Sequence, residues 1–318
     1  MPEKTNLSEK KLSDSINQIK KNLPSNTQLL FQPLNNVYLV STSAMDLIAA
    51  CGATENIGFS GTKKSDWYVK EARAAMESGK ILYAGKYSAP DYELLVSKGA
   101  CLAIQNTMIY HKPEAMEKLQ ELGISCLVEK CGSEGHPLGR FEWIKLYGAL
   151  FGKEKEAQAF FDEQIAKIQP VLNQKKTDKS IAFFYINKNG SVNVRAGKDY
   201  IARMIELAGA DYLPALSVND GDNSSTKTIQ IEDFFVSAKN ADIIIYSGIV
   251  DRPLESIKEL EEKNEIFRDF KACKDGRVYT VGKEFSQSTS SVTQFISDVN
   301  GILNGKEDNL VYIKRVSQ

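Results

Sequence analysis

One of the two histidines in this chain of 318 residues lies in the stretch SEGHPLGRFEWIKLYG (133–148). This residue, His136, stands between Glu134 and Arg140, where Pro137 and the pattern after it indicate the start of a helix. Arginine presents a planar fork of N–H donors that matches an anion, and nearby glycines let a ligand approach the backbone. The stretch therefore predicts a loop that grips an anionic ligand. The alternative is a capped helix start in which Glu134 pairs with Arg140 and His136 packs beneath them.

Catalytic patterns are poorly represented in the rest of the chain. There is no GxSxG, HExxH or Walker-A pattern, and no GxGxxG after the first expected strand. Cys131 and His136 could form a nucleophile and its base, but a thiol and an imidazole at this spacing more often coincide by chance. His111 and His136 are too few for a closed metal site, although either could be an axial ligand of haem iron or corrinoid cobalt. We therefore expect binding rather than catalysis.

Composition is that of a water-soluble globular protein, with 42% hydrophobic and 25% charged residues. The formal net charge of −1 gives no reason to expect nucleic acid or an anionic membrane surface as a partner. No window reaches the roughly 18 apolar residues of a transmembrane helix, and the polar residues 1–26 lack the apolar stretch of a signal peptide. The five cysteines have no CxxC spacing, so most are expected to be small buried hydrophobes.

Short apolar runs alternate with helical patterns along the chain. In the first half the expected strands are 37–40, 56–61, 81–85, 101–106 and 124–130. A long amphipathic helix is expected over about 153–175, with Pro170 near its end as the place where bending is easiest. The alternation then restarts, with expected strands at 180–187, within 231–248 and at 277–282. This order predicts an α/β fold with doubly wound parallel sheets.

Ligands of open parallel sheets bind beyond the carboxyl ends of the strands, on the loops that lead into the following helices. In this chain those loops are 41–43, 60–68, 85–88, 106–112, 132–140, 187–200, 218–228, 247–253 and 283–291. They are rich in aromatic, cationic and hydroxyl side chains. The expected ligand-binding residues are Ser43, Trp67, Tyr68, Tyr87, Met108, Tyr110, His136, Arg140, Arg195, Tyr200 and Phe285.

The order of these segments resembles the solute-binding proteins of bacterial ABC importers for iron siderophores, haem and cobalamin, over roughly residues 30–305. The similarity is carried by VYLVSTSAMDLIAACGATENIGFSG, APDYELLVSKGACLAI, EAMEKLQELGISCLVE, LYGALFGKEKEAQAFFDE, KDYIARMIELAGADYL and IQIEDFFVSAKNADIIIYSG. The family's Pro-Asp is replaced here by Gly99-Ala100-Cys101, and its Ser-Pro after the first strand by Ser41-Thr42. These departures advise against transferring one particular ligand.

The resemblance implies two Rossmann-like α/β lobes, each with a mainly parallel sheet, joined by a single long backbone helix. The implied divisions are a polar tether (1–29), a first lobe (30–150), the connecting helix (151–177) and a second lobe (178–318). The implied function is non-enzymatic capture of a metal chelate, which is passed to an ABC permease and its ATPase. A ferric siderophore ranks first and haem or cobalamin close behind, with His136 or Tyr110 as axial ligand if the chelate is haem. The alternative is a two-lobed metal or tetrapyrrole enzyme such as a chelatase.

The resemblance also implies a place outside the cytoplasm, either in the periplasm or on a lipid anchor that is absent from this sequence. We expect a monomer with no intrinsic cofactor and no metal held directly by the protein. Family members present one surface glutamate per lobe to the permease, and the matching positions are Glu93 and Glu232. A helix dipole also favours a carboxylate in a first turn, which is the structural alternative for both residues. A single connecting helix further predicts little movement of the lobes on binding.

Overall fold

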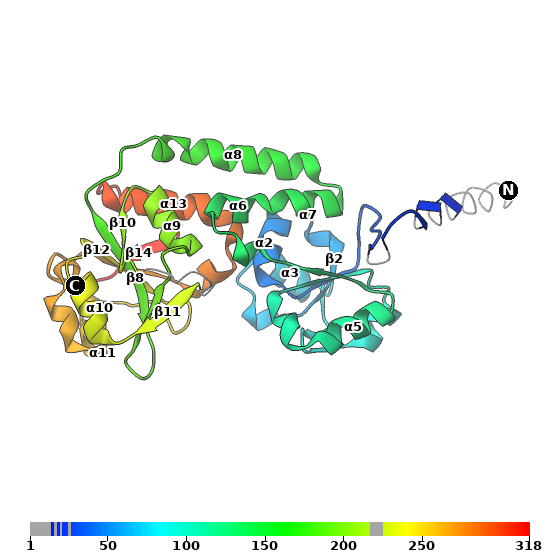
Figure 1. Cartoon of the computed structure of the whole chain (residues 1–318), viewed down its shortest axis with the longest axis horizontal. Helices are drawn as coiled ribbons and strands as arrows, with labels where there is room; N and C mark the ends of the chain where they lie inside the picture. Colours follow the sequence, from blue (N-terminus) through cyan, green and yellow to red (C-terminus); the bar gives the residue numbers. More distant parts are fainter. Residues whose placement is uncertain (1–13, 16–17, 20, 25–26, 217–224) are drawn as a thin grey trace.

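The computed structural model describes residues 14–15, 18–19, 21–24, 27–216 and 225–318. Two α/β lobes lie side by side, and helix α8 (Glu154–Leu172) runs across both of them (Figure 1). Most of the expected polar tether (1–29) falls outside the described residues. No helix among the described residues is long and apolar enough to cross a membrane.

The first lobe is built on a parallel sheet of five strands in the order β3-β2-β1-β6-β7. These are β1 (Val37–Leu39), β2 (Ile57–Ser60), β3 (Leu82–Tyr83), β6 (Leu102–Gln105) and β7 (Ser125–Val128). Helices α2 (Thr42–Ala50), α3 (Lys70–Glu77), α4 (Tyr92–Ser97) and α5 (Pro113–Glu121) connect them. The expected strand at 81–85 is cut short, because Gly85 adopts a φ of 79° and opens the hairpin of β4 (Gly85–Lys86) and β5 (Ala89–Pro90).

Three helices lead from the first lobe to the second. Helix α6 (Pro137–Glu142) is followed by α7 (Ile144–Phe151) and then by α8, which ends close to the expected boundary and carries Pro170 in its last turn. Helices α7 and α8 pack closely because Gly148 has no side chain. A Cβ atom added there would lie only 2.6 Å from the Cβ of Ala157. In Figure 1, α8 lies over α7 at one end and over α13 (Val292–Leu303) at the other.

The second lobe has a seven-stranded sheet in the order β11-β9-β8-β12-β13-β14, with β10 paired to β8. The parallel strands are β8 (Ser180–Ile186), β10 (Asp211–Leu213), β12 (Ile243–Ser247) and β13 (Val278–Val281). Three antiparallel strands extend it: β9 (Val192–Arg195), β11 (Thr226–Ile229) and β14 (Ile313–Arg315). The connecting helices are α9 (Tyr200–Leu207), α10 (Ile231–Ala238), α11 (Ile257–Lys263) and α12 (Lys271–Lys274).

The ranges 187–200 and 218–228 were therefore wrongly expected to be rim loops only. The first contains β9; of the second, residues 218–224 lie outside the described part of the chain and 226–228 form the start of β11. Each strand has only four residues, and TKTI has little apolar alternation, so the pairing partner rather than the local sequence selects the strand.

The largest hydrophobic cluster is continuous between the lobes. It contains β1 and α2 of the first lobe, β8 and α9 of the second, and the helices between them. Phe141 of α6 packs on Phe161 of α8 with ring centroids 5.2 Å apart, and Phe183 of β8 packs on Phe295 of α13 at 6.5 Å. The two lobes thus share a core on the side that α8 covers.

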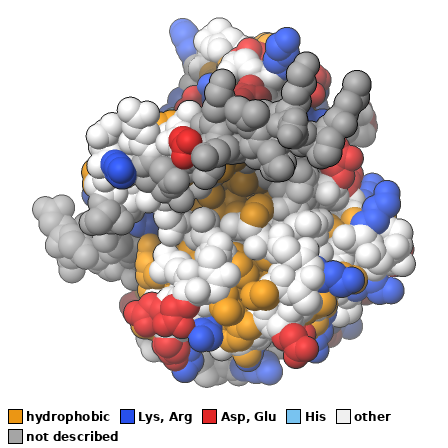
Figure 2. All heavy atoms as spheres, turned by 90° about the vertical axis from the view of Figure 1, so that its right-hand side faces the viewer, with side chains coloured by type: hydrophobic (Ala, Val, Ile, Leu, Met, Phe, Trp, Pro, Cys, Tyr) orange, Lys and Arg blue, Asp and Glu red, His pale blue; other side chains and the backbone are white. Residues whose placement is uncertain are grey.

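Charges of both signs are interspersed over the outer end of the first lobe. In Figure 2 this end faces the viewer, and hydrophobic side chains come to the surface in the middle of it. No single-sign field dominates this face.

Candidate functional site

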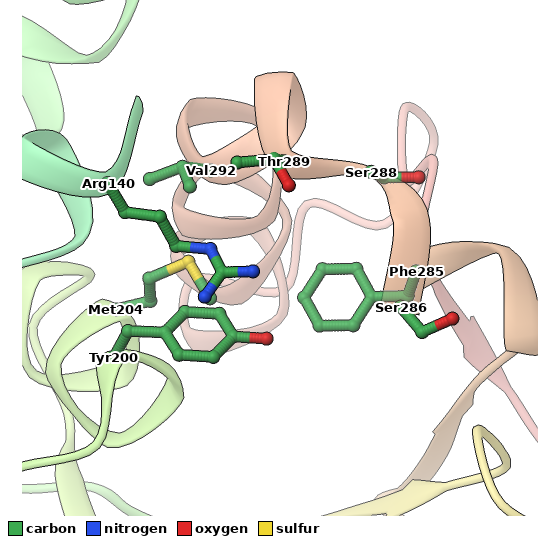
Figure 3. A pocket seen from close by; sticks show the side chains of 8 residues that line it. All are labelled: Arg140, Tyr200, Met204, Phe285, Ser286, Ser288, Thr289 and Val292. Atoms are coloured by element: carbon green, nitrogen blue, oxygen red, sulfur yellow. The ribbon is translucent and has the colours of Figure 1, made fainter. Parts of the chain in front are cut away.

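A small hollow lies where the two lobes meet, and we call it the interlobe hollow. Its walls come from α6 on one side and from α9, the 3-10 helices η6 (Lys283–Gln287) and η7 (Thr289–Ser291), and α13 on the other. The lining residues are Arg140, Tyr200, Met204, Phe285, Ser286, Ser288, Thr289 and Val292 (Figure 3). Of the eleven residues expected to bind ligand, the structure brings three together here: Arg140, Tyr200 and Phe285.

Arg140 is positioned by the start of α6. His136 is the N-cap of this helix, and its Nδ1 accepts a hydrogen bond from the backbone N–H of Leu138 at 3.2 Å. One turn later, the Arg140 guanidinium lies over the Tyr200 ring, 4.3 Å from its centroid. This cation–π contact spans the two lobes and holds the guanidinium beside the hollow (Figure 3).

The alternative interpretation of this stretch is confirmed in its capped helix start, but the two contacts it assumes are wrong. Glu134 does not pair with Arg140, because its carboxylate accepts a hydrogen bond from Trp143 Nε1 at 2.9 Å. His136 does not pack beneath the turn, because its side chain is exposed at the helix start. The turn is a capped helix start that also carries the arginine of the hollow.

Two buried carboxylates face Arg140 from opposite lobes. Glu129 of the first lobe accepts hydrogen bonds from Ser41 Oγ at 2.8 Å and Ser43 Oγ at 3.1 Å. Asp199 of the second lobe caps α9, where it accepts a hydrogen bond from Ile201 N–H at 2.9 Å. Burial raises the pKa of Asp199 above its usual range, although the nearby Arg195 and Arg140 act to lower it.

The same surroundings act on the charge of Arg140. Burial alone would lower its pKa, but nearby acidic groups outweigh burial and raise the pKa above its ordinary value. These groups are Tyr200, Cys131, Glu129 and Asp199. The hollow therefore keeps a permanent positive charge at low exposure to water.

Several polar groups around the hollow have no partner among the described residues. The Arg140 guanidinium makes no hydrogen bond or ion pair with any described residue. The Thr289 hydroxyl, on a residue only 4% exposed, and the fully buried Tyr147 hydroxyl also lack partners there. Each orphaned buried group costs roughly 1–3 kcal/mol of folding free energy unless a ligand or water satisfies it. The set of donors suits an anionic oxygen.

The enclosed part of the hollow is small. It holds about 10 Å³, which is the space of one water molecule. A whole chelate does not fit inside it, so the hollow can take one oxygen group of a larger ligand while the rest of the ligand lies outside.

Two of the expected ligand-binding residues are placed elsewhere. Trp67 does not line the cleft, because it is only 1% exposed and its Nε1 donates to Ser60 Oγ at 3.1 Å within the core of the first lobe. Arg195 lies on β9 rather than on a loop, over the Phe183 ring and 3.9 Å from Asp199. It forms an ion pair with Asp199 and does not line the hollow.

The remaining expected residues belong to the first lobe outside the hollow. Tyr68, Met108 and Tyr110 are exposed, with Lys130 Nζ 5.8 Å from the centroid of the Tyr110 ring. Tyr87 is half-buried against the core, and Ser43 is held by Glu129. Whether they contact ligand stays a prediction.

Five lining residues were not singled out from the sequence: Met204, Ser286, Ser288, Thr289 and Val292. Three of them lie within the expected rim loop 283–291, so a closer count of hydroxyls there would have found them. Met204 follows Tyr200 by one helical turn, and that spacing places both on one face of α9.

Burial argues against thiol chemistry beside the hollow. It raises the pKa of the Cys131 thiol to about 12, so the nucleophilic thiolate is scarce at neutral pH. All five cysteines are free: Cys51, Cys131 and Cys273 are buried, and Cys101 and Cys126 are half-buried. Among the described residues, no group of three or more His, Cys, Asp or Glu side chains could hold a metal ion.

Glu93 and Glu232 are both exposed in the first turns of their helices, α4 and α10. Helix α4 follows β5, beyond the carboxyl ends of the first sheet. Helix α10 follows β11, which is antiparallel to β9 and therefore runs in the direction of β8. Both glutamates thus lie at the carboxyl edge of their own sheet.

Comparison with known proteins gives a consistent picture. The sequence model of a family described as periplasmic binding protein matches residues 37–285. An uncharacterised lipoprotein of Methanocaldococcus jannaschii is 26% identical over 281 residues, which is 84% of this chain and 64% of the relative. The chain thus spans a little under two thirds of the length of that curated relative.

Solved structures show the same fold at low sequence identity. The periplasmic haem-binding protein HutB of Vibrio cholerae is 16% identical with a TM-score of 0.67, and the match covers 84% of this chain and 98% of HutB. A protein of an ABC-type Fe³⁺-hydroxamate transport system from Saccharomonospora viridis is 16% identical with a TM-score of 0.63, covering 86% and 94% of the two chains.

Proposed function

Because the chain belongs to the periplasmic binding protein family, we propose that it is the solute-binding component of an ABC importer. It captures a metal chelate between its two lobes and delivers the chelate to a permease. It works outside the cytoplasm, in the periplasm or on a lipid anchor, and it acts as a monomer without catalysis. The lipoprotein relative supports the proposed place.

The observation that carries this proposal is the Arg140 guanidinium, which lies between the lobes without a hydrogen-bond partner among the described residues. A charged donor stacked on Tyr200, with the unpartnered Thr289 hydroxyl lining the same hollow, is costly unless an anionic oxygen satisfies it. Ferric siderophores carry anionic oxygens around their metal, haem carries two propionates, and cobalamin carries a phosphate. We therefore rank a ferric siderophore first, with haem and cobalamin close behind.

If the chelate is haem, His136 or Tyr110 is the proposed axial ligand. The Nδ1 of His136 is used in the helix cap, which leaves its Nε2 for iron. Tyr110 is 52% exposed, so its hydroxyl is accessible. A haem complex would show a Soret band that shifts when the true axial residue is replaced.

The permease is proposed to contact both lobes through Glu93 and Glu232. Both carboxylates are exposed and lie at the carboxyl edges of their sheets, so one protein surface can reach them together. Rim charges of this kind mainly set association rate and register.

The function is tested by titrating the protein separately with a ferric catecholate, haemin and cyanocobalamin while tryptophan fluorescence is recorded. For the chelate that binds, Arg140→Ala should weaken affinity roughly tenfold or more, because a charged hydrogen bond is lost. Arg203→Ala is the matched control, since Arg203 is exposed on α9 and pairs with Glu206. Unchanged affinity in Arg140→Ala would contradict the assignment of the hollow. Turnover of a porphyrin would favour the chelatase instead.

A further inference from the structure

We call segment 283–291 the bridging segment. Some of its residues line the interlobe hollow, and others form hydrogen bonds with the first lobe. Phe285, Ser286, Ser288 and Thr289 line the interlobe hollow. Gln287 and Ser290, between and after them, bond to the first lobe instead. The wall of the hollow and the attachment of the second lobe to the first are thus one short piece of chain.

Gln287 makes the most specific of these attachments. Its Nε2 donates to the Asp66 carbonyl oxygen at 2.8 Å, and its Oε1 accepts from the Tyr68 backbone N–H at 2.9 Å. The Nε2 and Oε1 atoms of the amide therefore both bond to backbone groups across the lobe boundary, as the N–H and C=O groups of a neighbouring strand do in a sheet. The side chain is only 7% exposed, so water competes weakly for these bonds.

The loop of the first lobe that Gln287 contacts is itself held by hydrogen bonds and burial. Trp67, between the two residues that bind Gln287, is buried and donates its indole N–H to Ser60 Oγ. The carbonyl oxygen of Trp67 accepts hydrogen bonds from Arg73 Nε at 3.1 Å and Nη2 at 2.5 Å. Gln287 is therefore bound to a fixed point and not to a loop that could follow it.

A second tie lies three residues further along the bridging segment. The backbone N–H of Ser290 donates to Asp46 Oδ2 at 2.5 Å, and Asp46 belongs to α2 of the first lobe. Thr289, whose hydroxyl lines the hollow without a partner among the described residues, lies between these two ties.

We infer that Gln287 is a positioning residue that clamps the bridging segment to the first lobe and so builds the wall of the hollow. The hydrogen bonds that hold the lobes together then also place Phe285 and Thr289 opposite Arg140. The role of the hollow as a ligand site rests on the proposed function, whereas the clamp itself does not.

The clamp is tested without ligand by hydrogen–deuterium exchange resolved at single amides. In Gln287→Ala, the Tyr68 amide should exchange roughly tenfold faster, because its acceptor is gone. The Ser290 amide, which donates to Asp46, should accelerate with it. Amides of β8, such as Phe183, should keep their rates, because loss of the clamp opens only this boundary. Uniform acceleration everywhere would show a general structural role and overturn the inference.

Two further variants sharpen the test. Gln287→Glu keeps an acceptor for the Tyr68 N–H but loses the donor to Asp66, so Tyr68 exchange should fall between wild type and Gln287→Ala. Gln294→Ala is the matched control, because the Gln294 amide donates to Asp298 within α13 of its own lobe. Its Tyr68 exchange should match wild type. Wild-type exchange of Tyr68 in Gln287→Ala would overturn the clamp, while failure of every chelate to bind would overturn only the proposed function.

Discussion

At the residue scale, the central contrast is between paired and unpaired cations. Exposed arginines such as Arg203 and Arg252 have carboxylate partners within 2.7 Å and 2.5 Å. Arg140 is less exposed than these, faces two buried carboxylates and yet pairs with neither. A protein that leaves a partly buried guanidinium without a partner bears an energetic cost there, and ligand binding is the simplest way to offset it.

The hydroxyl of Thr289 allows this cost to be measured. Thr289→Val removes an orphaned buried hydroxyl without changing shape, so the free energy of unfolding should rise by roughly 1 kcal/mol. Thr293→Val is the matched control, because the Thr293 hydroxyl donates to Gln164 Oε1 at 2.9 Å and its loss should cost roughly 1 kcal/mol. Urea unfolding of both variants gives the comparison. Equal destabilisation by the two changes would mean that the Thr289 hydroxyl is satisfied.

The sequence allowed the residues of the hollow to be predicted only where they stand in segments that follow strands and were expected to be rim loops. Arg140, Tyr200 and Phe285 satisfy that condition and meet in space. Trp67 satisfies it too, but a tryptophan beside a small serine can fold back and fill the core, and loop position does not exclude this. The hydrogen bond from Trp143 to Glu134 could not be predicted from the sequence, because nine residues separate them across a helix start.

At the element scale, most of the parallel strands could be predicted because they are apolar runs flanked by turns, but the parallel strand β10, with the three residues DYL, was missed. The antiparallel strands β9 and β11 could not be predicted, since each is short and takes its conformation from its neighbour. This matters for the site, because β9 carries Arg195 beside the cap of α9. Arg195 was expected to contact ligand because its segment was taken for a loop. On the strand β9 it lies beside Asp199 instead.

One element-scale tie gives a pH prediction. The Asp242 carboxylate accepts hydrogen bonds from Lys271 Nζ and from the N–H and hydroxyl of Ser180, and so joins the start of β8 to α12. Burial alone would raise the pKa of Asp242, but these bonds outweigh it and hold the pKa below its usual range. A carboxyl with a lowered folded-state pKa stabilises the fold above its unfolded pKa of about 3.9. That contribution is lost as pH falls through the folded-state value.

Asp242→Asn should therefore cost roughly 1–2 kcal/mol of unfolding free energy at pH 7. The difference from wild type should shrink as the pH is lowered from about 4, because wild-type Asp242 then becomes neutral as well. Urea titrations at several pH values between 7 and 3 measure it. A difference that stays constant down to pH 3 would show that the carboxylate charge contributes nothing.

At the scale of the whole molecule, three features resist relative motion of the lobes. A continuous helix joins them, one hydrophobic cluster runs through both, and the bridging segment ties the second lobe to the first. None of these offers a hinge loop that could absorb a large change of φ and ψ. Pro170 lies in the last turn of α8, so any bend there would come after most of the helix.

Small-angle scattering of the free protein and of its chelate complex should therefore differ only slightly in radius of gyration. The chelate is the one that binds among the ferric catecholate, haemin and cyanocobalamin. In Gln287→Ala, the free protein should become slightly more expanded, because one of the three restraints is weakened and only the Ser290 tie of the bridging segment remains. A compaction typical of hinge-closing binding proteins would contradict this prediction.

The contact with the importer also belongs to the whole molecule, because it needs both lobes at a fixed separation. Glu93 and Glu232 each stand in the first turn of a helix, where the helix dipole favours a carboxylate whether or not a partner exists. Exposure and position alone therefore do not separate docking from simple helix stabilisation. Reversal of both charges does.

In the double variant Glu93→Lys/Glu232→Lys, helix stabilisation predicts a loss of roughly 0.3–1 kcal/mol per site and no other effect. Docking predicts that ligand-stimulated ATPase activity of the reconstituted importer is abolished while chelate affinity stays within about twofold, since neither residue lines the hollow. Glu117→Lys/Glu262→Lys is the matched control, because both glutamates are exposed on helices but stand outside the first turn. The control should stimulate the ATPase normally. Normal stimulation by Glu93→Lys/Glu232→Lys would leave the helix dipole as the whole reason for these two carboxylates, even with the fold and the ligand site correct.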